Sequence, residues 1–212
     1  MISRSRKTLF VHIPKTGGQS IESVFLKDAG LAWRDRGQLG LGRNPDKENG
    51  PTRLAHLYAS EYVALGHVTQ AEFDAFTRFA IVRHPYDRMI SEYRYRAASW
   101  KRKGDPAVGF DDFIRWTPED EKLDIARHLV PQVTYVQDSE GRSLVPHIVH
   151  LEQMAVEMAG LWQTMLGTIP DVPHKNASKP KFGPGRQDLT VPQKRFLQDR
   201  YAEDFQCFGY DP

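Results

Sequence analysis

The chain has 212 residues, of which 40% are hydrophobic and 26% are charged, and its formal net charge is +2. This length and composition suffice for one domain with a substantial core, and we expect a single domain over residues 1–212. The small net charge argues against a nucleic-acid binder, which depends on many cationic contacts to phosphates. The single cysteine, Cys207, excludes an intramolecular disulfide and a cysteine-based zinc site.

Membrane insertion is not expected from the hydropathy pattern. No apolar run approaches the roughly 20 residues that span a bilayer. The N-terminal segment MISRSRKTLFVHI has basic residues but lacks the apolar region of a signal peptide. We therefore expect a cytoplasmic protein with no integral membrane association.

The first regular element is expected at Thr8–Ile13, a β-branched apolar run that is typical of a buried parallel strand. The residues PKTGG follow, and apolar residues then recur at helical spacing over residues 18–27. Unpaired N–H groups and the helix dipole make such a helix N-terminus an anion site. Glycines let the backbone approach the anion, Lys15 adds a charge, and Thr16 and Ser20 add hydroxyl donors.

The next elements alternate between strand and helix. Strands are expected at Tyr62–His67 and Arg78–His84, with a short helix over residues 70–76 between them. Pro85 suits the first position of a long amphipathic helix. This alternation predicts an α/β fold with a parallel sheet and helices on both of its faces.

The second half of the chain contains shorter patterns. Helices are indicated by the stretches FDDFIRW and EKLDIARHLV. A strand that leads into a helix over residues 152–166 is indicated by PHIVHLEQM. A last helix is expected over residues 192–205. The glycine- and proline-rich stretches Gly37–Pro51 and Pro170–Gln187 are predicted to be loops.

A second anion contact is expected after the strand that ends near Arg83. Open α/β sheets bind ligands at the carboxyl ends of their strands. Ser91 follows two helical turns later and meets the same anion if the helix folds back beside the strand. Arginine suits a terminal phosphate because its guanidinium donates two hydrogen bonds at once. Taken alone, Arg83 is equally explained as a structural ion-pair partner.

Together the stretches FVHIPKTGGQSI and FAIVRHPYDRMISEYRY resemble the two nucleotide-binding signatures of sulfotransferases that use 3′-phosphoadenosine 5′-phosphosulfate. The resemblance is strongest to the carbohydrate branch with the uronyl 2-O and chondroitin-type enzymes. The resemblance extends over nearly the whole chain through the stretches LGHV, RHLVPQ, PHIVHLEQM and YAEDFQCFGY. It implies a P-loop-like α/β fold. The animal relatives carry a membrane anchor that this chain lacks, so we expect a bacterial or trimmed enzyme.

The resemblance also implies roles for individual residues. Arg83 and Ser91 would bind the 3′-phosphate of the donor, and Lys15 would reach its bridging oxygen. Ser178 and Lys179 would be further donor contacts, although a solvated basic loop explains them equally well. The residues implied around the 5′-phosphosulfate are Lys15, Thr16, Gly17, Gly18, Gln19 and Ser20.

The base that takes the proton of the acceptor hydroxyl is expected to be a histidine or a glutamate with a raised pKa. His67 is the first choice, because it ends a predicted strand and resembles the Gly-His that carries the base in the uronyl branch. A buried histidine that caps a strand is the alternative for His67. Glu22 and Glu92, in the helices after the two motifs, are alternative bases or surface charges.

The other histidines are expected to have roles other than that of the base. His128 and Gln132 resemble an H-x-x-x-Q element of the chondroitin-type branch and would position the acceptor. His12 is expected to brace the first loop. No metal is expected, because cationic side chains can neutralise the leaving phosphate, and His147 and His150 make a poor ligand pair.

The predicted function is transfer of a sulfuryl group from 3′-phosphoadenosine 5′-phosphosulfate to a hydroxyl, with a carbohydrate as the expected acceptor. The basic and aromatic stretch YRYRAASWKRK could hold an anionic glycan or be a solvated helix face. A small-molecule kinase of the P-loop type is one alternative, but its G-K-[ST] order is absent from the loop. A non-catalytic nucleotide-binding protein is another.

Overall fold

The computed structural model describes residues 1–46, 48–119, 123–173 and 183–212. Its centre is a four-stranded sheet in the order β1-β2-β3-β4, in which β2, β3 and β4 are parallel and β1 pairs antiparallel with β2. The α/β fold with a parallel sheet flanked by helices is therefore confirmed. The strands are β1 (Ile2–Ser3), β2 (Thr8–Val11), β3 (Thr77–Val82) and β4 (His147–His150).

Helices fill most of the remaining chain. The α-helices are α1 (Gly18–Asp28), α2 (Glu61–Ala64), α3 (Gln70–Ala75), α4 (Pro85–Lys103), α5 (Phe110–Arg115), α6 (Asp124–Leu129), α7 (Val133–Val136), α8 (Met154–Leu166), α9 (Val191–Arg200) and α10 (Ala202–Cys207). Short 3₁₀ segments are η1 (Trp33–Leu39), η2 (Leu54–His56), η3 (Leu151–Gln153) and η4 (Arg186–Asp188). Within the described residues, no helix combines the length and apolar composition needed to cross a bilayer.

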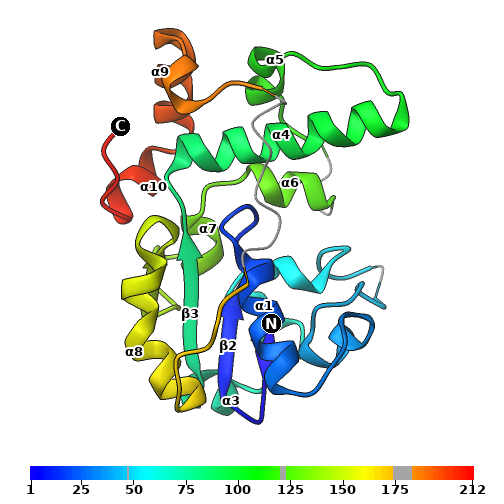
Figure 1. Cartoon of the computed structure of the whole chain (residues 1–212), viewed down its shortest axis with the longest axis vertical. Coiled ribbons are helices and arrows are strands. Elements are labelled where there is room, and N and C mark those ends of the chain that lie inside the picture. Colours follow the sequence, from blue (N-terminus) through cyan, green and yellow to red (C-terminus); the bar gives the residue numbers. More distant parts are fainter. Residues whose placement is uncertain (47, 120–122, 174–182) are drawn as a thin grey trace.

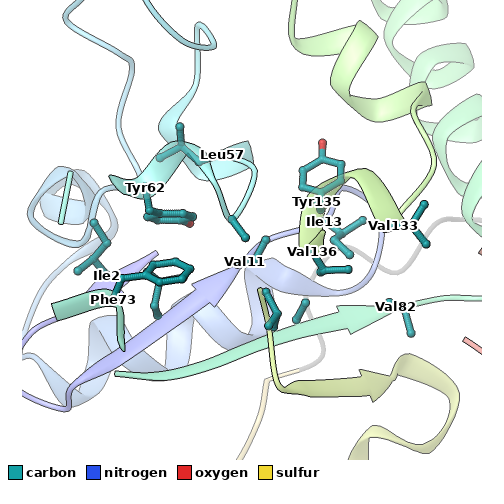
Figure 2. Close-up of a cluster of buried hydrophobic side chains, with 14 of the residues drawn as sticks. Ile2, Val11, Ile13, Leu57, Tyr62, Phe73, Val82, Val133, Tyr135 and Val136 are labelled. Atoms are coloured by element: carbon teal, nitrogen blue, oxygen red, sulfur yellow. The ribbon is translucent and has the colours of Figure 1, made fainter. Parts of the chain in front are cut away.

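Each face of the sheet buries its own hydrophobic cluster, because successive strand residues point to opposite faces. Figure 2 shows Val11, Ile13 and Val82 beneath side chains from α2, α3 and α7, among them Tyr62 and Phe73. The opposite face is covered by α1 and α8.

The third cluster lies beyond the carboxyl ends of the strands. It joins α4, α5, α9 and α10 through buried side chains such as Tyr86, Ile90 and Phe113. Figure 1 shows β3 leading into α4, which passes across this end of the sheet, with α5, α6 and α9 beside it. The loops after β2 and β3 therefore lie between the sheet and a layer of helices.

Two expectations about elements are wrong. The expected strand Tyr62–His67 is the short helix α2 followed by a turn at Gly66, whose φ is 71°. Tyr62 and Val68 are buried in this stretch, whereas a strand covered on both faces would bury every residue. The expected last helix is divided at Tyr201 into α9 and α10. The Tyr201 hydroxyl donates to the Leu129 carbonyl, which ties the break to α6.

Candidate active site at the carboxyl edge of the sheet

The loop between β2 and α1 has a strained backbone that a side-chain hydrogen bond closes. Lys15 adopts a positive φ of 69°, which costs a non-glycine residue about 1–2 kcal/mol. The Thr16 hydroxyl donates to the Ile13 carbonyl over 2.8 Å and so closes the turn from inside. Strained backbone of this kind is concentrated at functional sites.

Gly18 is required by packing, and Gly17 is favoured by its left-handed backbone conformation. A Cβ at Gly18 would lie 2.1 Å from the ring of His12, and a Cβ at Gly17 would lie 3.0 Å from Leu151 Cδ1. Gly17 is also the N-cap of α1 at φ 83° and has no side chain that could accept a bond from the first turn. The Ser20 N–H donates to the Gly17 carbonyl over 3.0 Å, so the groups that can attract an anion here are the backbone N–H groups before Ser20 and the helix dipole.

Arg83 leaves the end of β3 and reaches this loop. Its Nη1 donates to the Lys15 carbonyl over 3.3 Å. Gln132 fixes its backbone from both sides: the Arg83 N–H donates to Gln132 Oε1 over 2.9 Å, and Gln132 Nε2 donates to the Arg83 carbonyl over 2.8 Å. The two sequence motifs thus meet at one edge of the sheet.

Helix α4 begins directly after this arginine. Pro85 occupies its first turn, and the His84 side chain caps it by accepting from the Tyr86 N–H. Ser91 lies two turns into the helix and is buried. Arg83 and Ser91 therefore belong to one continuous strand–helix unit that folds over the carboxyl edge.

Positive charge is concentrated at this edge. Burial lowers the pKa of Lys15; Glu92 opposes the shift, and the charges of Arg83 and Arg96 add to it. Burial likewise lowers the pKa of Arg83, although its guanidinium stays charged at neutral pH. Two cations that have lost part of their hydration bind an anion more strongly than exposed ones do.

Three histidines gather beside the loop, and we call His12, His56 and His128 the histidine cluster. The ring of His56 stands edge-on to both others, with centroid distances of 4.8 Å to His12 and 5.0 Å to His128. His12 Nδ1 is hydrogen-bonded to Glu22 Oε1 over 2.5 Å. The backbone carbonyl of His12 lies 3.2 Å from His56 Nδ1. The expectation that His12 braces the loop is therefore confirmed.

His128 connects the cluster to α4. Its Nδ1 lies 2.8 Å from Glu92 Oε2, and Glu92 also accepts from Arg96 over 2.6 Å. Burial alone would raise the pKa of Glu92, but the charges of His128, Arg96 and Lys15 outweigh it and lower the pKa to about 2. Burial lowers the pKa of His128, but Glu92 and Asp124 outweigh it and the net pKa is raised. His128 and Glu92 thus form a buried ion pair.

His56 belongs to η2 and was missed in the sequence, where it is one histidine in a loop without a recognisable pattern. Its position becomes apparent from the contact of its ring with His12 and from the bond between the carbonyl of His56 and Arg127 Nη1, 3.0 Å long. Its side chain is 12% exposed, slightly more than that of His128 at 8%.

His67 lies away from this site. It follows α2 by three residues and precedes α3, which Figure 1 places at the end of the sheet opposite α4. Its carbonyl accepts from Arg4 Nη2 over 2.8 Å, next to the turn that joins β1 and β2. The expectation that His67 shares an edge with Lys15 is therefore wrong, because the strand that would have carried it there is a helix.

The remaining expected residues fall into two groups. Gln132 has no exposed surface, and His128 is 7% exposed. Ser178 and Lys179 lie outside the described residues.

Comparison with known proteins assigns the chain to a class. A family model described as "Sulfotransferase family" matches residues 1–211. Neither a search of curated proteins nor a search of solved structures found a match.

Proposed function

Because the chain belongs to the sulfotransferase family, we propose that it transfers a sulfuryl group from 3′-phosphoadenosine 5′-phosphosulfate to an acceptor hydroxyl. The observation that carries the proposal is the 3.3 Å contact between Arg83 Nη1 and the Lys15 carbonyl. This contact joins a loop of the phosphate-binding type to an arginine at the same edge of the sheet. A donor that carries phosphate groups at the 3′ and 5′ positions of its ribose requires two such neighbouring anion contacts.

The loop and the start of α1 would hold the 5′-phosphosulfate. Backbone N–H groups before Ser20, together with the Lys15 ammonium and the Ser20 hydroxyl, would be the donors for this group. Thr16 would contribute its backbone, since its hydroxyl donates to Ile13. Gln19 is exposed at the first turn of α1 and would contribute its side chain.

The 3′-phosphate would be bound by Arg83 and Ser91. Gln132 would act indirectly, because its amide holds the backbone of Arg83 in place. This role replaces the acceptor contact expected for Gln132 from the sequence.

In the reaction the acceptor oxygen attacks the sulfur atom while the bond from sulfur to the phosphate oxygen breaks. Lys15 would neutralise the negative charge that develops on the leaving phosphate. A positioned cation accelerates group transfer by stabilising this charge in the transition state. The second product is adenosine 3′,5′-bisphosphate.

The proton of the acceptor would go to His56 Nε2. Its Nδ1 lies 3.2 Å from the His12 carbonyl, so Nδ1–H donates there and the lone pair is left on Nε2. Burial and the neighbouring His12 and His128 lower the pKa of His56 as well, so the choice rests on its partners. Both oxygens of Glu92, the alternative base, are bonded to His128 and Arg96, whereas His56 Nε2 has no such bond within the described residues.

A carbohydrate acceptor is supported by the surface next to Lys15. The ring of Tyr95 is 53% exposed, and the Lys15 Nζ lies 4.4 Å from its centroid. Exposed aromatic rings pack against the apolar faces of sugars.

The experiment is a product assay. The protein is incubated with the phosphosulfate donor and with acidic and neutral oligosaccharides, and sulfated product and adenosine 3′,5′-bisphosphate are measured by mass spectrometry. His56→Gln should lower turnover by about 10²-fold or more, whereas the exposed His147→Gln should match the wild type. Full turnover by His56→Gln would refute the base assignment, and phosphorylated product from ATP would favour the kinase.

A further inference from the structure

Three side chains at the outer side of the histidine cluster have the composition of a metal site. His56, Asp124 and His128 place one ligand atom each so that all three atoms lie within 4.8 Å of one another. We propose that these residues bind a single divalent transition-metal ion such as Zn²⁺. No metal was expected from the sequence, since cationic side chains can neutralise the leaving phosphate; His56 lies 68 positions before Asp124, and nothing in the pattern pairs them.

The distances are close to those of a tetrahedral site. Asp124 and His128 lie four residues apart on α6 and so share a helix face. His128 Nε2 is 3.5 Å from Asp124 Oδ2, and His56 Nε2 is 4.0 Å from Asp124 Oδ1. Ligands at about 2.0–2.1 Å from zinc are about 3.3 Å apart. The two histidines face different oxygens of Asp124, so the three ligand atoms, which lie within 4.8 Å of one another, would have to draw together around the ion to reach this spacing.

The outer partners of both histidines leave the correct nitrogen for a metal. His128 Nδ1 is bonded to Glu92 Oε2 over 2.8 Å, and His56 Nδ1 is bonded to the His12 carbonyl over 3.2 Å. In metal sites a ligating histidine donates its other N–H to a carboxylate or carbonyl in this manner, which fixes the tautomer. Here both Nε2 atoms are directed to the same carboxylate.

Two atoms of the site are buried without a hydrogen bond from the part of the chain that the structure describes. They are His128 Nε2 and Asp124 Oδ1, and His128 is only 7% exposed. Buried polar atoms are almost always bonded. A metal ion that displaces the Nε2 proton of His128 would contact both atoms.

The ion can enter from solvent. The Asp124 side chain is 28% exposed, and the Arg53 side chain that lies 3.6 Å from it is 57% exposed. Arg53 can therefore swing away and leave the carboxylate to the metal. A bound ion would take the His56 Nε2 lone pair and block the proposed base; this consequence rests on the proposed function, whereas the binding does not.

The test is binding of Zn²⁺ and Co²⁺ to the metal-free full-length chain, by calorimetry and by the visible absorption of Co²⁺. One ion should bind per chain, with the intense absorption of a four-coordinate cobalt site. Asp124→Asn and His56→Gln should each weaken binding by about 100-fold or more, since loss of an outer partner alone costs 10–100-fold.

His147→Gln is the matched control, because it removes an exposed histidine on β4 and should bind as the wild type does. Circular dichroism establishes that each variant is folded. The proposal is overturned if the wild type does not bind either ion, or if both site variants bind them as tightly as the control. Because the readout is binding, this result is independent of whether sulfuryl transfer is found.

Discussion

The substitution Gly18→Ala tests how tightly the first loop is packed. The added Cβ would lie 2.1 Å from the His12 ring, whereas ordinary contacts begin near 3.4 Å, a shortfall of 1.3 Å. The ring cannot simply retreat, since it is bonded to Glu22 over 2.5 Å, stacked on Phe10 and in contact with His56. Either His12 or the start of α1 must move.

The expected loss is about 1–3 kcal/mol of unfolding free energy, the usual cost of overpacking a filled interior. It is measured by urea denaturation. Because the loop shifts, affinity for adenosine 3′,5′-bisphosphate should fall as well, which calorimetry measures.

Gly160→Ala is the matched control for this substitution. Gly160 lies within α8, and a Cβ there meets no atom within 4 Å. Because alanine is the better helix former, this variant should be more stable than the wild type by about 0.5–1 kcal/mol. If Gly18→Ala were as stable as the wild type and bound the nucleotide equally well, the packing argument for the loop would be refuted.

Further predictions concern the site itself. Gln132→Leu leaves the N–H and carbonyl of Arg83 without their partner and should lower the unfolding free energy by about 1–3 kcal/mol, measured by urea denaturation; an unchanged midpoint would contradict the bracing role. Lys15→Met should lower turnover by about 10²–10³-fold in the product assay, because the leaving phosphate loses its cation; near-normal turnover would exclude Lys15 from the reaction. Zn²⁺ should inhibit turnover of the wild type and a chelator should restore it, whereas Asp124→Asn should lose this sensitivity; equal inhibition of both would place the inhibitory ion elsewhere.

The strand–loop–helix unit around Lys15 could be predicted from the sequence because its determinants are local. A β-branched run, a glycine pair and an amphipathic helix follow one another, and each is recognisable within a few residues. Arg83 and Pro85 were predictable for the same reason, since a buried strand ends and a proline begins the next helix. The parallel order of β2 and β3 then brings the two loops to one edge.

The histidine assignments depend on contacts between distant parts of the chain. The run from Tyr62 to Leu65 is apolar, and four such residues are compatible with a strand or a helical turn. Its neighbours decide the outcome, because the Tyr62 hydroxyl donates to the Phe10 carbonyl and receives a bond from the buried N-terminal amine. His67 was consequently assigned to the wrong edge, and His56, whose partners are 44 and 72 positions away, was overlooked.

The most direct test of the donor assignment is calorimetric binding of adenosine 3′,5′-bisphosphate, ADP and ATP to the wild type, Arg83→Ala and the control Arg102→Ala. Arg102 lies near the end of α4, away from the loop, and is exposed. The account predicts that the wild type and Arg102→Ala prefer the bisphosphate and that Arg83→Ala loses this preference while remaining folded. Equal or tighter binding of ATP by the wild type would contradict it.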